Sequence, residues 1–280
     1  MKRIHKLIAA ALALTMLTPM TAALPASAAE AWRTEYQKLL NANKTTTSDD
    51  MTTKMYSLAD IVGDGIPELM ISDGMYHMAN AKIYTYYQGK VVLLGELGEG
   101  GSVIFDATTN ELYDGYTSMG YFVEEHYRYR CGELEHTKSF ADSEGAESSP
   151  YYKIDGKNVS ASQYKAARKE VESHNWKGYG RDYLTTNLTP LNNFKVTNPV
   201  ATPGNLTGDS VINASDAAKI LIGASNYGAK GQTGLTGAQE DAGDVNGDHR
   251  INASDAAIVL IYSAAVGAGK SGARLQDYIR

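Results

Sequence analysis

The chain has 280 residues, of which 43% are hydrophobic and 21% are charged, and its formal net charge at pH 7 is −6. This composition is ordinary for a globular protein and argues against a wholly disordered chain. The net negative charge provides no basic footprint for nucleic acid and disfavours attraction to an anionic membrane surface. The length accommodates one large domain or two smaller ones.

The first 28 residues predict a secretory signal peptide. MKRIHK is positively charged, LIAAALALTML forms a short apolar core, and small residues at Ala26 and Ala28 follow it. This order is typical of a signal peptide that is cleaved after Ala28, and the core is shorter than the roughly 20 apolar residues that span a bilayer. We therefore expect a secreted, extracellular protein that makes no membrane contact after cleavage.

The remaining sequence changes character near residue 190. Most tyrosines precede this point, a stretch rich in Pro, Asn and Thr follows it, and the C-terminal part is rich in Gly, Ala and Asp. Such Pro-containing stretches favour extended linkers. We predict a first domain over residues 29–195, a linker over 196–203 and a second domain over 204–280. The single cysteine, Cys131, has no partner for an internal disulfide, so bound metal is the other staple to look for.

Residues 29–195 predict an α+β fold. Helices are indicated over 30–43 and over 163–174, where Ser160 and Gln163 form a capping-box pattern. Between these helices, the sequence predicts strands at 67–73, 82–87, 90–97, 102–107, 111–117, 121–130 and 133–140. Turn residues occur at Gln88-Gly89, Thr109-Asn110, Cys131-Gly132 and Asp155-Gly156. The pattern favours an antiparallel sheet with flanking helices.

One stretch of this region, DIVGDGIPEL from Asp60 to Leu69, resembles the short calcium loops of integrin-like repeats, which read DxDxDGxxEL. The resemblance implies a metal site formed by Asp60, Asp64 and Glu68. Val62 replaces the oxygen ligand at the third position of the pattern. The alternative is a glycine turn that joins two strands and holds no metal.

The second domain contains the heptapeptide INASDAA twice, at residues 212–218 and 251–257. Each copy overlaps the end of a twelve-residue segment that has oxygen-bearing side chains at positions one, three, five, nine and twelve. These side chains are Asn205, Thr207, Asp209, Asn213 and Asp216 in the first loop, and Asp244, Asn246, Asp248, Asn252 and Asp255 in the second. Because Ca²⁺ takes six to eight oxygen ligands, donors at alternate positions of a tight loop can wrap the ion.

Two further positions of these loops bear on calcium binding. At position seven a backbone carbonyl is the ligand, and the residues there, Val211 and Arg250, carry no side-chain oxygen. Position six usually holds Gly, but here it is Ser210 and His249. A left-handed conformation at a non-Gly residue costs about 1 kcal/mol. The first loop has two carboxylates and the second has three, so we predict weaker calcium binding at the first loop.

This duplicated pattern resembles a type I dockerin over about residues 204–270, and the Asp at position twelve fits that family. The resemblance implies a small all-α domain with two EF-hand-like calcium loop–helix repeats that bind two Ca²⁺ ions. Residues 235–243 match the short connecting helix of the family. The partner that the resemblance implies is a cohesin domain of a scaffoldin.

The helix expected over residues 255–267 is apolar nearly all round, and an exposed apolar patch on such a helix marks a partner site. The resemblance implies that loop positions ten and eleven, with the helix after them, contact the cohesin. These residues are Ala214, Ser215, Lys219, Ala253, Ser254 and Ile258. Since Ala-Ser occurs in both copies, we expect two docking orientations related by a half-turn.

The function of the first domain stays open between two classes. Tyrosines in KIYTYYQGK, HYRYR and SPYYK favour a non-catalytic binding or accessory module that touches plant cell-wall polysaccharide, although tyrosine also favours strands without any ligand. The alternative is a small glycoside hydrolase, with carboxylates as candidates by type only: Glu124, Glu125, Glu133 and Glu135. A thiol nucleophile would pair Cys131 with one of three histidines, His126, His136 or His174. In either case the dockerin resemblance implies a cellulosome component acting in plant polysaccharide degradation.

Overall fold

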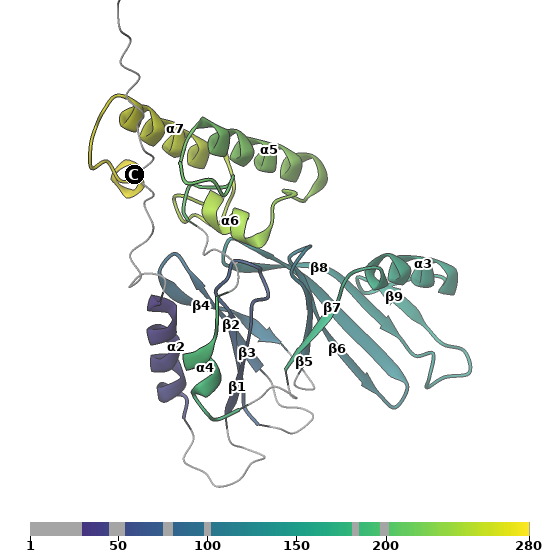
Figure 1. Ribbon diagram of the computed structural model, residues 1–280. Helices are drawn as coiled ribbons and strands as arrows, with labels where there is room; N and C mark the ends of the chain where they lie inside the picture. Colours follow the sequence, from purple (N-terminus) through teal and green to yellow (C-terminus); the bar gives the residue numbers. More distant parts are fainter. Residues whose placement is uncertain are drawn as a thin grey trace, which may run out of the picture.

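The structure is a computed structural model that describes residues 30–44, 54–74, 81–97, 102–180, 185–196 and 202–279. It consists of an N-terminal α+β region and a helical C-terminal region, which confirms the predicted fold class (Figure 1). The predicted signal peptide and most of the predicted linker lie outside the described residues. Within them, no helix has both the length and the apolar character needed to cross a membrane.

The first sheet is antiparallel and has the strand order β1-β2-β3-β4. Its strands are β1 (Met55–Ala59), β2 (Glu68–Ser72), β3 (Ala81–Tyr87) and β4 (Lys90–Leu97). Every residue of β2 is buried, because both faces of this central strand are covered. The predicted turn at Gln88-Gly89 joins β3 to β4, as expected for a short hairpin.

The second sheet has seven strands in the order β10-β9-β8-β7-β6-β5-β11, and all of its pairs are antiparallel. Its strands are β5 (Ser102–Asp106), β6 (Glu111–Ser118), β7 (Tyr121–Arg130), β8 (Glu133–Asp142), β9 (Tyr152–Ile154), β10 (Lys157–Asn158) and β11 (Lys177–Gly180). The predicted turns at Cys131-Gly132 and Asp155-Gly156 are confirmed. The sequence did not indicate the turn at Met119-Gly120, because methionine is not a usual turn residue.

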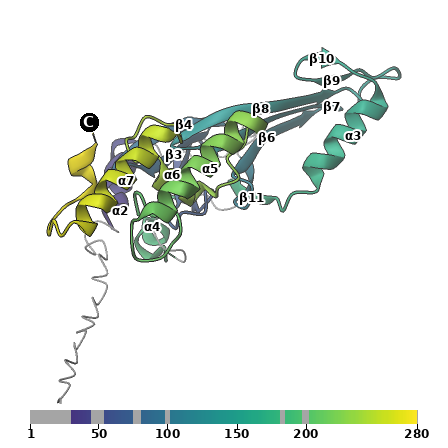
Figure 2. The ribbon, with the colours of Figure 1, turned by 90° about the horizontal axis from the view of Figure 1, so that it is seen from above.

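The two sheets share one apolar core, in which Met70 and Ile83 of the first sheet meet Phe105 and Leu112 of the second. Helices α2 (Ala31–Ala42) and α4 (Thr189–Asn193) cover the outer face of the first sheet. Helix α3 (Ala161–Glu172) lies at the opposite end of the molecule from α2, beside the second sheet (Figure 2). The predicted capping box of Ser160 and Gln163 is present at its start.

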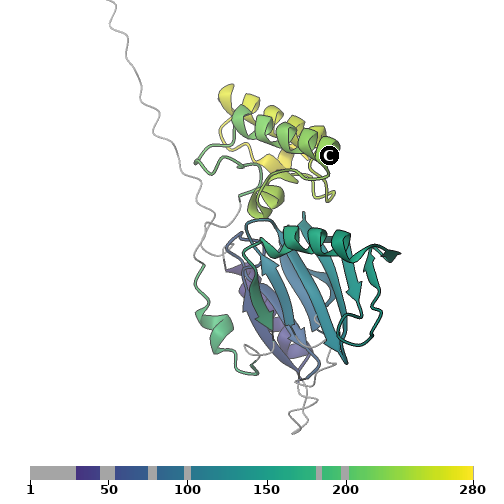
Figure 3. The same ribbon diagram turned by 90° about the vertical axis from the view of Figure 1, so that its right-hand side faces the viewer.

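The C-terminal region contains α5 (Ala214–Lys230), α6 (Gly237–Gly243), α7 (Ala253–Gly267) and the short 3₁₀ helix η2 (Leu275–Tyr278). Helices α5 and α7 lie side by side, and α6 lies between them and the N-terminal region (Figure 3). Each long helix begins at an Asn whose side chain accepts a backbone hydrogen bond, followed by an Asp at the third helical position that completes a capping box. The repeated heptapeptide is therefore a repeated helix start.

Candidate calcium loops and docking face

The last acid of each loop ties the beginning of the loop to the start of the following helix. Asp216 Oδ1 accepts backbone hydrogen bonds from Leu206 N and Thr207 N, both at 2.9 Å. Asp255 Oδ1 accepts from Val245 N at 3.0 Å and from Asn246 N at 3.3 Å. Both carboxylates are fully buried. Each twelve-residue segment is thereby closed into a ring.

The second loop brings three carboxylates together. Single oxygen atoms of Asp244, Asp248 and Asp255 all lie within 4.8 Å of one another. Burial raises the pKa of Asp255 to about 6 and also raises the pKa of Asp244, because the charged forms lose hydration. A hard divalent cation would stabilise those charged forms, and an all-oxygen donor set is the kind that Ca²⁺ prefers. The residues present therefore fit calcium.

The neutral predicted ligands lie around the same loops. Asn252 caps α7 by accepting from Ser254 N at 2.7 Å, and Asn246 Nδ2 donates to Asp248 at 3.1 Å. In the first loop, Asn205 Oδ1 accepts from Gly208 N at 2.9 Å, and Thr207 Oγ1 donates to Asp216 at 2.9 Å. The remaining predicted ligand residues lie as follows: Asn213 caps α5, and Asp209, Val211 and Arg250 are exposed.

The expected left-handed conformation at position six occurs in one loop only. His249 has a φ of 62°, whereas Ser210 is not among the residues with positive φ. In both loops the glycine at position four is left-handed, with φ of 74° at Gly208 and 71° at Gly247. The strain that the sequence indicated for both loops is therefore confined to His249, and its imidazole makes contacts that Ser210 does not make.

The loop residues expected to contact a partner are exposed, but neither of the two helix residues is. Loop positions ten and eleven are exposed in both copies, at Ala214, Ser215, Ala253 and Ser254. Lys219 is partly buried and donates to Leu206 O at 2.9 Å. Ile258 is only 9% exposed and belongs to the apolar core of the C-terminal region, which corrects its assignment to an outer face.

The apolar side chains that are exposed on the outer face of α5 and α7 are two other pairs, and Ile258 is not among them. Leu221 and Ile222 of α5 are 45% and 60% exposed, and Leu260 and Ile261 of α7 are 43% and 53% exposed. The pairs occupy matching positions after the two heptapeptides. The sequence did not reveal the α7 half of this face, because a helix that is apolar all round gives no amphipathic signal.

The N-terminal loop from Asp60 to Glu68 repeats much of this hydrogen-bond pattern. Glu68 Oε2 accepts from Ile61 N at 2.7 Å and from Val62 N at 3.3 Å, and Asp64 Oδ1 accepts from Ile66 N at 2.8 Å. Burial raises the pKa of Asp64 to about 7. Val62 is fully buried and supplies no side-chain oxygen. A metal at this loop stays a prediction.

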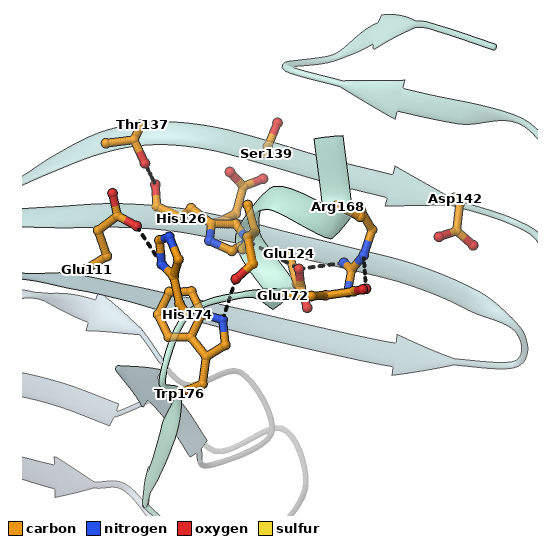
Figure 4. Close-up of polar contacts among 12 residues, drawn as sticks. Glu111, Glu124, His126, Thr137, Ser139, Asp142, Arg168, Glu172, His174 and Trp176 are labelled. Atoms are coloured by element: carbon orange, nitrogen blue, oxygen red, sulfur yellow. Dashed lines mark hydrogen bonds and ion pairs between the residues drawn. The ribbon is translucent and has the colours of Figure 1, made fainter. Parts of the chain in front are cut away.

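The carboxylates considered for hydrolysis are hydrogen-bonded to basic side chains or exposed. Buried Glu124 accepts from Arg168 Nη1 at 2.6 Å and lies 3.1 Å from His126 Nε2 (Figure 4). Glu125 faces the other side of β7 and pairs with His136 at 2.7 Å. Glu133 and Glu135 are exposed. A cavity of about 430 Å³ beside α3 is lined by two further acids, Asp142 and Glu172, among other residues. Asp142 accepts a hydrogen bond from Tyr164, and Glu172 forms an ion pair with Arg168.

The side chains of the cysteine and of the three tyrosine motifs are buried or partly buried. The Cys131 thiol is fully buried, and burial raises its pKa, so the thiolate that a nucleophile requires is disfavoured. His174 pairs with Glu111 at 3.1 Å instead. In the three tyrosine motifs, Tyr87 and Tyr129 are buried and the others are partly buried: Tyr84, Tyr86, Tyr127, Tyr151 and Tyr152. They form no flat exposed platform.

The C-terminal region is thus a duplicated loop–helix module with a loop of oxygen-bearing side chains at the start of each long helix. Residues 203–262 match the family model of the type I dockerin domain. The chain therefore contains a type I dockerin domain, a class of domain that binds calcium and attaches to a cohesin of a cellulosomal scaffoldin. No curated protein and no solved structure matches the chain.

Proposed function

We propose that this protein docks on a cohesin through the outer face of α5 and α7, and that calcium in the loops 205–216 and 244–255 holds that face in shape. The observation that carries the proposal is the duplicated exposed face of Leu221, Ile222, Leu260 and Ile261. Exposed apolar residues on matching positions of two packed helices are costly in water and suited to a partner surface.

Calcium contributes to docking through the positions of the helices. Each loop ends in the first turn of a long helix, and Asp216 and Asp255 are both capping residues and proposed ligands. A bound ion supplies positive charge to the buried carboxylates. Because a preformed metal site rarely exists in an unfolded chain, the free energy of ion binding stabilises the folded state, and we expect the paired helices to depend on calcium.

The wider role is inferred from the assembly in which dockerin domains occur. We propose that residues 1–28 are a signal peptide and that the mature chain is a secreted cellulosome component in plant polysaccharide degradation. For residues 29–195, a non-catalytic accessory role fits best, since the buried candidate acid Glu124 is neutralised by Arg168 and lacks the environment of a general acid. This N-terminal region is called the cargo below.

Binding of the mature chain to immobilised type I cohesins, with calcium and then with a chelator, tests the docking proposal. We expect binding only with calcium. Combined Ile222→Asp and Ile261→Asp changes should weaken it at least about 30-fold, as loss of a central apolar contact does. Each single change should cost only about twofold, because one of two equivalent orientations remains.

The matched control for these substitutions is Leu93→Asp. Leu93 is an exposed leucine of β4, 48% exposed, that belongs to the first sheet and not to α5 or α7, and its replacement should leave cohesin binding unchanged. Wild-type affinity in the double variant, or binding that persists in the chelator, would refute the proposed face.

A further inference from the structure

Three turns of the cargo reach the dockerin domain, and each does so through a strained residue. The contacting residues are Gln88, Asn110 and Cys131, with φ of 50°, 58° and 46°. Left-handed backbone is uncommon for residues other than glycine and persists where the surrounding structure fixes it. The turns thus present particular groups to the dockerin domain.

Residues at two of these turns form hydrogen bonds and a ring contact with the second calcium loop. The Tyr87 hydroxyl donates to Asp244 Oδ2, and Gln88 Nε2 donates to the Asp244 carbonyl oxygen at 2.8 Å. The Tyr87 ring stacks on His249 at a centroid distance of 5.5 Å. His249 Nδ1 lies 2.6 Å from the Cys131 carbonyl oxygen. Positions one and six of the loop are therefore both fixed by the cargo.

The third turn and strand β7 form hydrogen bonds with α6 and with the residues just before it. Helix α6 precedes the second loop in the chain. The Asn110 side chain donates to Leu235 O at 3.2 Å and accepts from Gly237 N at 2.8 Å. Tyr129 donates to Asp241 at 2.8 Å. A Cβ added at Gly237 would lie 2.5 Å from Val62 O, so only glycine permits this approach. Particular hydrogen bonds and close contacts therefore join the cargo to the dockerin domain both at α6 and at the second loop.

The first loop lies in a different environment. Thr207, Gly208, Asp209 and Ser210 are exposed, and Asn205 at position one is hydrogen-bonded within its own loop. Asp244, at the matching position of the second loop, is fully buried. The two copies of the repeat thus differ in what surrounds their first ligand.

We propose that Tyr87 and Gln88 are positioning residues for calcium binding at the second loop. They fix the side chain and the backbone of Asp244 in the orientation that the loop presents to the ion. This inference rests on the proposed assignment of residues 244–255 as a calcium loop. Outer-shell hydrogen bonds of this kind orient metal ligands and set affinity. By thermodynamic linkage, calcium binding in turn stabilises the contact between the dockerin domain and the cargo.

Calcium titration of the mature chain, followed by calorimetry, tests the proposal. Tyr87→Phe retains the ring that stacks on His249 and removes only the hydroxyl donor. We expect the affinity of the second loop to fall about tenfold, with the first loop unchanged. Asp216→Asn, which removes a first-loop ligand, identifies which binding step belongs to which loop. Tyr86→Phe is the matched control, since Tyr86 packs toward the opposite face of β3.

A second variant and a second readout keep the test independent of folding. Gln88 is exposed, so Gln88→Ala leaves the cargo core intact and should weaken the second loop about threefold, as loss of one neutral hydrogen bond does. Amide hydrogen exchange across residues 126–135 should slow when calcium is added, and this protection should shrink in both variants.

The outcomes separate two kinds of failure. Unchanged second-loop affinity in Tyr87→Phe and Gln88→Ala would overturn the positioning role, as would tighter binding in either variant. If Asp255→Asn leaves both calcium affinities unchanged, the assignment of the second loop itself fails, and the positioning role fails with it.

Discussion

The two calcium loops of the dockerin end in the same five residues, INASD, but occupy unequal surroundings. The first loop is largely exposed and has two carboxylates, Asp209 and Asp216. The second gathers three carboxylates within 4.8 Å and rests against the cargo through Asp244 and His249. The difference teaches that a duplicated sequence specifies a duplicated local structure, while its neighbours decide how alike the two sites are.

The largest expected effect comes from the last acid of each loop. Asp255→Asn should abolish calcium binding at the second loop, because it removes a charge and one acceptor from the closed ring. Asp216→Asn should do the same at the first loop. We expect the fall in midpoint of thermal unfolding with calcium to be larger for Asp255→Asn, since the second loop also holds the cargo.

The same pair of variants measures the two loops separately. Calcium titration of Asp216→Asn reports the second loop, and titration of Asp255→Asn reports the first. We expect the weaker remaining affinity in Asp255→Asn, because the first loop has one carboxylate fewer. Equal affinities, or a tighter first loop, would break the comparison.

A smaller effect concerns Glu240 of α6, which leads into the second loop; the matching position before the first loop is Ala201 in the sequence. It is buried and accepts from Thr233 Oγ1 at 2.5 Å, with Arg128, Arg130 and Glu135 nearby. Burial raises its pKa from 4.5 to about 7. Its contribution to stability is therefore complete below about pH 4.5 and is lost as the pH rises through about 7.

Glu240→Gln should remove this pH dependence. At pH 8 the variant should have a free energy of unfolding higher than wild type by at most about 3 kcal/mol, at 1.36 kcal/mol per pKa unit. At pH 4.5 the two proteins should be nearly equal. Chemical denaturation of both at fixed calcium, at the two pH values, checks this; an equal difference in stability at the two pH values would show that folding does not raise the pKa of Glu240.

The smallest effect tests what the loops have in common. Gly208 and Gly247 have nearly the same φ, and an added Cβ would meet nothing within 4 Å at Gly208 and only Gln88 Cγ at 4.0 Å at Gly247. Gly208→Ala and Gly247→Ala should each cost about 1 kcal/mol of unfolding free energy through backbone strain alone. Denaturation midpoints that differ strongly between the two variants would show that the backbone strain is unequal.

The sequence predicted the repeated elements well because their determinants are local. Asn and Asp at fixed spacing make both the loop and the cap of the next helix, so α5 and α7 and the α6 connection were found where they were expected. In the cargo, Gln88-Gly89 and Cys131-Gly132 marked hairpins for the same reason. Met119-Gly120 did not, since methionine is not a usual turn residue.

The sequence by itself indicated two loops with the spacing of calcium ligands, a helix after each, and an antiparallel cargo, because caps, turns and ligand spacing are encoded in neighbouring residues. Only the tertiary structure decided that Ile258 faces inward and that Leu260 and Ile261 face outward, since an all-apolar helix has no preferred face until others pack on it. It also decided that Tyr87 meets Asp244, a contact between residues 157 positions apart that no local pattern encodes.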